Sequence, residues 1–193
     1  MDYPLPPGID LLACDEPLID GPGPSITSFE IALPSETLLL LSAGAWLSGS
    51  VRVTTSTNTD SIRFSITTKM IGWRWTNTAN TIVCSLKRNE GEFGVGIFAS
   101  AVCWIFSSGL LISRAQNPTT FEPSHLQVQY DVLIELPEDS PFINRFETHV
   151  VNTQQYFDDL QGKIFFEHLN LHGSNGGIRA QVSNLAFCRI PKC

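Results

Sequence analysis

The sequence predicts an all-β domain, either a β-sandwich, a barrel or a β-solenoid. In several short runs apolar and polar residues alternate, and the longest run is 126–136, where Leu133 is the only exception. Because successive side chains of a strand point to opposite faces, such a run has one buried and one hydrated face. Turn-forming residues separate the runs, at 58–60, 137–140 and 173–177.

The chain divides into an arm, a β domain and a tail. Residues 1–28 are rich in Pro, Gly and acidic residues, and because proline fixes φ and lacks an amide donor we predict an extended or disordered arm. The β domain is expected at 29–181, with a divergent apolar insert at about 99–116. Residues 182–193 form a C-terminal tail that does not match the strand pattern. Helix signals are poor, with one turn at most near 153–160.

Residues 93–113 contain no charged side chain. About 20 apolar residues are enough to cross a bilayer as a helix. Glycines, serines, and β-branched and aromatic residues dilute this segment, so two consecutive buried strands or a loop is our main interpretation. A membrane-tethered protein with one span at 93–113 is the alternative.

Composition narrows the possible partners and compartments. Charged residues make up only 16% of the chain, and the net charge is −7. No run of Lys and Arg exists, so we predict that the protein does not bind nucleic acid. The N-terminus lacks a signal-peptide pattern, and the five cysteines are scattered, odd in number and never spaced as CxxC. These features favour free thiols and a cytoplasmic location.

Two blocks of the sequence resemble a known family. The first holds Phe29–Leu38 and Gly49–Val53, and the second holds Leu126–Pro137, Phe146–Thr148, Leu160–Phe166 and Leu169–Ala180. The period of strand, Gly-Ser-Asn-Gly and Ile-x-Ala resembles the putative-adhesin β-solenoid domain, and is most similar to uncharacterised versions from mushroom-forming, basidiomycete-type fungi. The resemblance implies stacked right-handed coils that repeat about every 20 residues. It therefore favours a β-solenoid-like stack of short strands, with an antiparallel β-sandwich as the alternative, and it implies no catalytic residues.

Several motifs that suggest chemistry have simpler explanations. His168 and His172 have a zinc-like spacing on a helix, but on a strand they would stand about 13 Å apart. Gly173–Gly177 lacks the following helix of a phosphate loop and is typical of a turn. The adjacent acidic pairs lie in arms or turns, unlike the two opposed carboxylates of a glycosidase. We therefore predict no catalytic residue, no metal site, no cofactor and no enzymatic activity.

Trp73, Arg74 and Trp75 are the candidate ligand-binding residues. Alternation along a strand places both indoles on one face and Arg74 on the other, where paired aromatic rings can stack on sugars or partner surfaces. We predict a non-enzymatic interaction or structural module, adhesin-like by resemblance, whose partner is a protein or glycan surface. The alternative is a carbohydrate-binding β domain that uses these tryptophans. Self-association through an open sheet edge is a further expectation.

Overall fold

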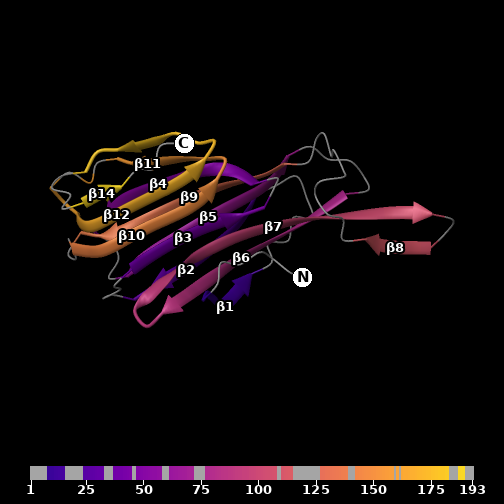
Figure 1. Cartoon of the computed structure of the whole chain (residues 1–193), viewed down its shortest axis with the longest axis horizontal. Helices are drawn as coiled ribbons and strands as arrows, with labels where there is room; N and C mark the ends of the chain where they lie inside the picture. The colour runs from indigo at the N-terminus through magenta and orange to yellow at the C-terminus, as the bar shows by residue number, and fades with distance from the viewer. Residues whose placement is uncertain are drawn as a thin grey trace.

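The computed structural model describes residues 8–15, 24–32, 37–44, 47–57, 61–71, 77–107, 110–114, 127–138, 142–158, 160, 162–182 and 187–189. Within these residues the chain forms fourteen strands and no helix. The strands make two mixed sheets, A and B, which share one apolar core (Figure 1).

Sheet A has the strand order β1-β6-β7-β3-β10-β12-β14, with β8 paired to β7. Its strands are β1 (Asp10–Asp15), β3 (Thr37–Ala43), β6 (Asn77–Asn89), β7 (Glu92–Ser107), β8 (Leu110–Arg114), β10 (Phe142–Val151), β12 (Phe165–Ser174) and β14 (Phe187–Arg189). β6 and β7 form a long antiparallel hairpin, on which β1 and β8 also pair in antiparallel fashion. From β7 through β3, β10 and β12 to β14 all pairings are parallel.

Sheet B has the strand order β13-β11-β4-β9-β5-β2. Its strands are β2 (Ser25–Ile31), β4 (Leu47–Ser56), β5 (Ile62–Ile71), β9 (Gln127–Pro137), β11 (Thr153–Phe157) and β13 (Ile178–Ala180). The pairings from β13 to β9 are parallel, whereas β9 with β5 and β5 with β2 are antiparallel. Each sheet therefore has a parallel part and an antiparallel part.

The parallel parts arise because the chain crosses from sheet A to sheet B three times in the same sense. β3 is followed by β4, β10 by β11 and β12 by β13. In sheet A these strands lie in the order β3-β10-β12, and in sheet B in the matching order β4-β11-β13. The three crossings are thus neighbouring coils of one winding.

Two asparagines make the sharp corners of this winding. Asn152 and Asn175 have φ values of 48° and 54°, in the left-handed region that asparagine tolerates better than most residues. The amide of Asn152 donates to the Ser174 carbonyl over 2.7 Å, and the side-chain amide of Asn175 donates to Asn152 Oδ1 over 3.1 Å. Asn152 Nδ2 in turn donates to the Leu47 carbonyl over 3.1 Å, so the corners of successive coils are hydrogen-bonded in a column.

The core between the sheets is aromatic and aliphatic, with one polar group of side chains inside it. Phe146 makes edge-to-face contacts with Phe157 and Phe166, at ring-centroid distances of 5.4 and 5.9 Å. The buried Tyr130 hydroxyl hydrogen-bonds to the hydroxyls of Ser42, at 2.9 Å, and Thr153. Burial raises the pKa of Tyr130, which keeps the phenol neutral.

The prediction of an all-β fold is confirmed. Two facing sheets agree with the sandwich alternative in outline, although the sheets are mixed and not antiparallel throughout. A solenoid is not confirmed, because β1, β2, β5, β6 and β8 leave the parallel winding and pair in antiparallel fashion. The turn predicted at Gly173–Gly177 is found as the corner at Asn175.

Three segments predicted to lie outside the β pattern contribute strands. The arm at 1–28 holds β1 and the first part of β2, because each meets a partner strand that is distant in sequence. The insert at 99–116 includes the end of β7 and all of β8, and the tail at 182–193 includes β14. Residues 93–107 and 110–113 lie in β7 and β8, which agrees with the main interpretation of two consecutive strands and not with a helical span. Among the described residues, no helix is long and apolar enough to cross a membrane.

The expectation that all cysteines are free is also corrected. Cys14 on β1 and Cys84 on β6 form a disulfide and are partners in the antiparallel ladder. Their sequence separation of 70 residues gives no local spacing signal, because the register of two strands brings them together. The argument for a reducing compartment therefore loses its support. The side chains of the other cysteines lie outside the described set.

A substitution at Gly176 tests how closely two neighbouring coils approach each other. A Cβ atom at this position would lie 1.8 Å from the Thr153 carbonyl oxygen, a backbone atom of the preceding coil. We expect Gly176→Ala to lower the free energy of unfolding by about 2–3 kcal/mol, measured by urea denaturation. Ser174→Ala, at an exposed side chain of the same corner, should change it by less than about 0.5 kcal/mol. Equal stability of the two variants would contradict the close approach of the coils.

Candidate binding surface

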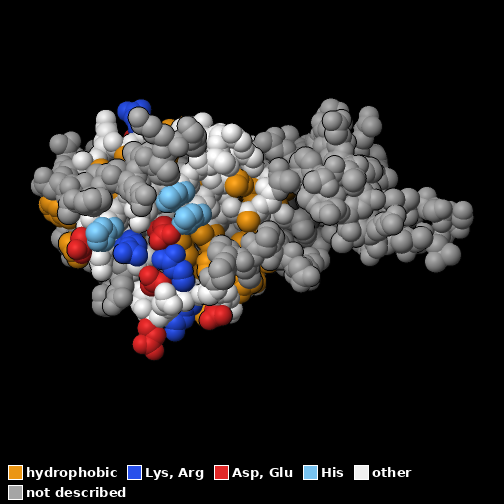
Figure 2. All heavy atoms as spheres, in the orientation of Figure 1, with side chains coloured by type: hydrophobic (Ala, Val, Ile, Leu, Met, Phe, Trp, Pro, Cys, Tyr) orange, Lys and Arg blue, Asp and Glu red, His pale blue; other side chains and the backbone are white. Residues whose placement is uncertain are grey.

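The outer face of sheet A carries polar side chains in cross-strand register. On β10 the buried residues Phe146, Thr148 and Val150 face the core, so Glu147 and His149 point outward between them. On β12 their partners are Asn170 and His172, and Arg145 lies opposite His168. Figure 2 shows basic, acidic and histidine side chains gathered on this face of the molecule.

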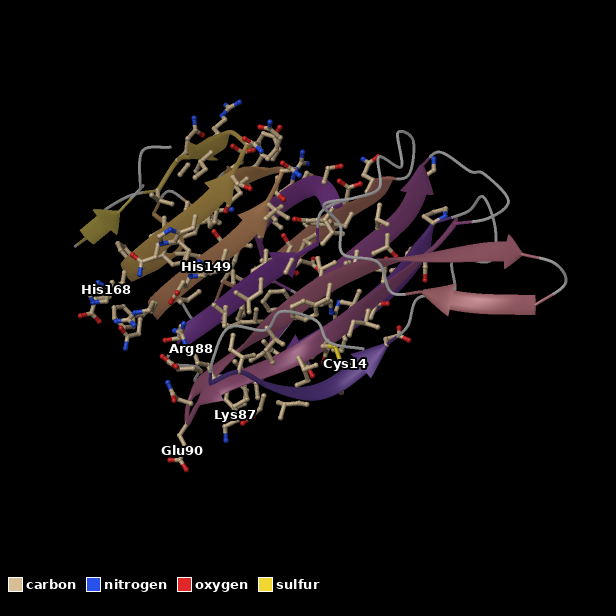
Figure 3. The ribbon with its side chains drawn as sticks, turned by 45° about the vertical axis from the view of Figure 1, so that its right-hand side comes forward. Cys14, Lys87, Arg88, Glu90, His149 and His168 are labelled. Atoms are coloured by element: carbon tan, nitrogen blue, oxygen red, sulfur yellow. A yellow bond between two sulfur atoms is a disulfide. The ribbon has the colours of Figure 1, made fainter. Side chains whose placement is uncertain are left out.

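Arg88 joins the β6–β7 hairpin to the coil strands. Figure 3 shows Arg88 near the turn of this hairpin. Its Nε atom lies 3.0 Å from Glu92 Oε2, and its Nη2 atom lies 3.0 Å from Glu147 Oε2. Glu92 also accepts hydrogen bonds from Asn89 over 2.6 Å and from Thr37 over 3.4 Å. One guanidinium therefore connects carboxylates on two strands, β7 and β10, that are not neighbours in the sheet.

His149 extends this network towards β12. Its Nε2 atom lies 2.6 Å from Glu147 Oε1. Its ring stacks on that of His172, with centroids 4.6 Å apart and an interplanar angle of 8°. We call Arg88, Glu92, Glu147, His149 and His172 the charged patch.

The charged patch holds its carboxylates in the ionised form. The hydrogen bond from His149, followed by that from Arg88, lowers the pKa of Glu147 to about 2, against the opposing effect of burial. The hydrogen bond from Arg88 also lowers the pKa of Glu92, while Glu147 and Glu92 raise that of Arg88. The side chains of Arg88, Glu92 and Glu147 are only 24%, 14% and 13% exposed, so these ion pairs are screened less than pairs on an open surface.

An apolar cluster borders the charged patch on the same face of sheet A. It consists of Leu39, Leu41, Ile82, Cys84, Leu86 and Phe98, with Ile9 and Ala43 packed against it. Gly96 makes room for it, since a Cβ atom there would lie 2.5 Å from the Phe98 ring. The disulfide thus ends in the apolar cluster, through Cys84.

The structure accounts for some of the predicted site residues and not for others. Trp73, Arg74 and Trp75 lie outside the described residues. His168 and His172 lie on a strand, as predicted, and His172 has a histidine from β10 as its stacking partner. The described side chains include no group of three or more His, Cys, Asp or Glu placed to hold a metal ion.

Sequence reasoning missed the charged patch. The polar residues of β10 and β12 do share one parity, at 145, 147 and 149 and at 168, 170 and 172, and that pattern was readable. The sequence does not show the parallel register that sets His149 beside His172. It also does not show that Arg88, on a distant hairpin, forms an ion pair with Glu147.

Comparison with known proteins identifies no family for this chain. No family model and no curated protein matches it. A crystal structure of a "putative cell adhesion protein" from Clostridium sporogenes ATCC 15579 is similar, at 12% sequence identity and a TM-score of 0.35. The match covers 81% of this chain and 57% of that protein, so the chain corresponds to little more than half of its length. None of these comparisons supports membership of a fungal family.

The lowered pKa of Glu147 predicts a pH-dependent contribution to stability. Its carboxyl has a pKa of about 2 in the folded protein, against an ordinary value of 4.5. The unfolded chain therefore takes up the proton first as the pH falls, and stabilisation that is complete above about pH 4.5 is lost towards pH 2. We expect Glu147→Gln to lower the free energy of unfolding by on the order of 2 kcal/mol at pH 6, and by much less near pH 2.5.

Urea denaturation of both proteins between pH 6 and 2.5 measures this difference. Glu135→Gln, on the outer face of sheet B, is the matched control and should change the free energy of unfolding at pH 6 by less than about 0.5 kcal/mol. If Glu147→Gln and the parent chain lost stability in parallel over this range, the ion pairs of the charged patch would contribute nothing to folding.

Proposed function

We propose that the protein is a non-enzymatic, adhesin-like interaction module that contacts its partner through the outer face of sheet A. The observation that carries the proposal is the charged patch. Its side chains come from β6, β7, β10 and β12 and are fixed by ion pairs, a short hydrogen bond and ring stacking. They are nevertheless partly open to solvent, with His149 45% exposed.

Such an arrangement suits recognition because its groups are held in place before a partner arrives. Ordering a free Arg or Glu side chain at an interface costs about 0.5–1.5 kcal/mol. In the charged patch the mutual contacts of Arg88, Glu92 and Glu147 have already restricted these side chains. Fixed charges on regular strands then favour partners with complementary charge over others.

The partner that best fits this face is a second copy of the chain. A two-fold contact places the same surface on both sides, so the surface must be complementary to itself. The outer face of sheet A carries both signs of charge, with Arg145 opposite His168 at one end of β10 and the carboxylates of Glu92 and Glu147 nearby. Phe142, 60% exposed at the start of β10, adds an aromatic side chain of the kind that anchors protein interfaces.

Aggregation of protein-coated beads tests this function. Beads that carry the full chain should aggregate. The double variant Arg145→Ala, His149→Ala should weaken the association about tenfold, also when it is followed by sedimentation velocity. Lys69→Ala, at an exposed position on the outer face of sheet B, should behave like the parent chain. Beads that stay dispersed, or a double variant that aggregates as well as Lys69→Ala, would refute the proposal.

The carbohydrate-binding alternative built on Trp73 and Trp75 stays a prediction. Its test is a glycan array on which Trp75→Ala loses binding. A glycan signal without bead aggregation would favour that alternative over the self-associating module.

A further inference from the structure

The outer face of sheet B carries a row of three side chains that the functions above do not use. Tyr156 on β11 is the register partner of Arg179 on β13 and of Arg52 on β4. Tyr156 therefore lies between two strands, each of which carries an arginine at the same level. Neighbouring strands lie about 4.8 Å apart, so the row is roughly 10 Å wide, comparable to one or two sugar rings.

The three side chains of this row point away from the core. Val51 and Val53 on either side of Arg52 are buried, as are Gln155 and Phe157 on either side of Tyr156. Arg52 is exposed and Tyr156 is partly exposed, while the side chain of Arg179 is 67% exposed. An aromatic ring between two solvent-exposed arginines, of which Arg179 also faces Asp158, is thus available to a ligand on this face.

Polar groups surround the row, and not all of their hydrogen-bonding and ion-pairing groups are used within the described part of the chain. In the next row Gln154, Ser50 and Asp131 are register partners, and Ser50 donates to Asp131 over 2.6 Å. Asp158 Oδ1 lies 3.6 Å from Arg179 Nε and makes no hydrogen bond within the described part of the chain. Arg52 forms no ion pair with another described residue.

These groups match the chemistry of an acidic sugar. The face of an aromatic ring offers a rigid apolar platform for the C–H face of a pyranose. Guanidinium groups recognise carboxylate and sulfate oxygens through paired hydrogen bonds. Amide, hydroxyl and carboxylate groups such as those of Gln154, Ser50 and Asp131 are suited to sugar hydroxyls. The whole chain has a net charge of −7, and the carboxylates of Asp131 and Asp158 lie beside the row. Recognition of an anion therefore depends on directed hydrogen bonds from Arg52 and Arg179 and not on a general positive field.

We propose that Arg52, Tyr156 and Arg179 form a binding site for an anionic saccharide that carries carboxylate or sulfate groups. The site lies on sheet B, so it is independent of the contact proposed for sheet A. Loss of saccharide binding on sheet B would leave the self-association through sheet A intact, and the reverse also holds.

Titration calorimetry of the full chain tests the site with three defined probes. These are an oligogalacturonate hexamer for carboxylate, a heparin-derived hexasaccharide for sulfate, and cellohexaose as the neutral sugar. Binding of either acidic probe and not of cellohexaose supports the proposal, and the stronger of the two identifies the anionic group. If neither acidic probe binds at millimolar concentration, the proposal fails.

Matched variants separate the site from general attraction between charges. Arg52→Ala and Lys69→Ala each remove one positive charge from the outer face of sheet B, but only Arg52 belongs to the row. We expect Arg52→Ala and Tyr156→Ala to weaken binding at least about tenfold, and Lys69→Ala to weaken it less than about twofold. Tyr156→Phe, which keeps the ring, should stay within about threefold of the parent chain.

Equal losses for Arg52→Ala and Lys69→Ala would overturn the site in favour of unspecific electrostatic attraction. Thermal unfolding of each variant shows whether it is folded. Bead aggregation by Arg52→Ala should equal that of the parent chain, which keeps failure of this site distinct from failure of the function proposed for sheet A.

Discussion

The hydroxyl group of Tyr130 is the point at which the two sheets are tied together. Tyr130 stands on β9 in sheet B, and its hydroxyl meets Ser42 on β3 in sheet A and Thr153 at the start of β11. The same two hydroxyls satisfy Val151 on β10, since Ser42 Oγ accepts from its amide over 3.0 Å and Thr153 Oγ1 donates to its carbonyl over 2.5 Å. A buried polar group without a partner costs about 1–3 kcal/mol, so any shift in strand register that separated these atoms would be opposed.

A second set of hydrogen bonds also joins the two sheets. Thr148 on β10 donates to Gln155 Oε1 on β11 over 2.8 Å, and Gln155 Nε2 donates to the carbonyl of His172 on β12 over 3.4 Å. Both proposed surfaces follow from this arrangement, because side chains alternate along a strand. With Thr148 fixed inside, Glu147 and His149 must lie outside on sheet A; with Gln155 fixed inside, Tyr156 must lie outside on sheet B. The interior hydrogen bonds thus determine which side chains face solvent on sheet A and on sheet B.

The local strand patterns of this fold can be predicted from the sequence, whereas most of the pairing between distant strands cannot. The alternation at 126–136 correctly marks a strand with one buried face, because that pattern depends only on the pleat. The strand at Asp10–Asp15 was missed because all six of its residues are exposed, and its existence depends on pairing with β6. Cys14 and Cys84 were missed for the same reason. The charged patch and the row of Arg52, Tyr156 and Arg179 depend on the register between strands, which no local pattern encodes. The predicted tryptophan site at Trp73 and Trp75 stays a prediction.

The disulfide between β1 and β6 also determines how the chain transmits a mechanical load. A pull on the chain from the N-terminal side of Cys14 passes through the sulfur atoms directly to Cys84. The intervening residues, which include β2, β3, β4 and β5, are then outside the path of the force. These strands, which belong to both sheets, would therefore carry no tension and would remain folded while the disulfide is intact. Reduction of the bond would place them in series with the pull, and β1 would peel from β6 one hydrogen bond at a time.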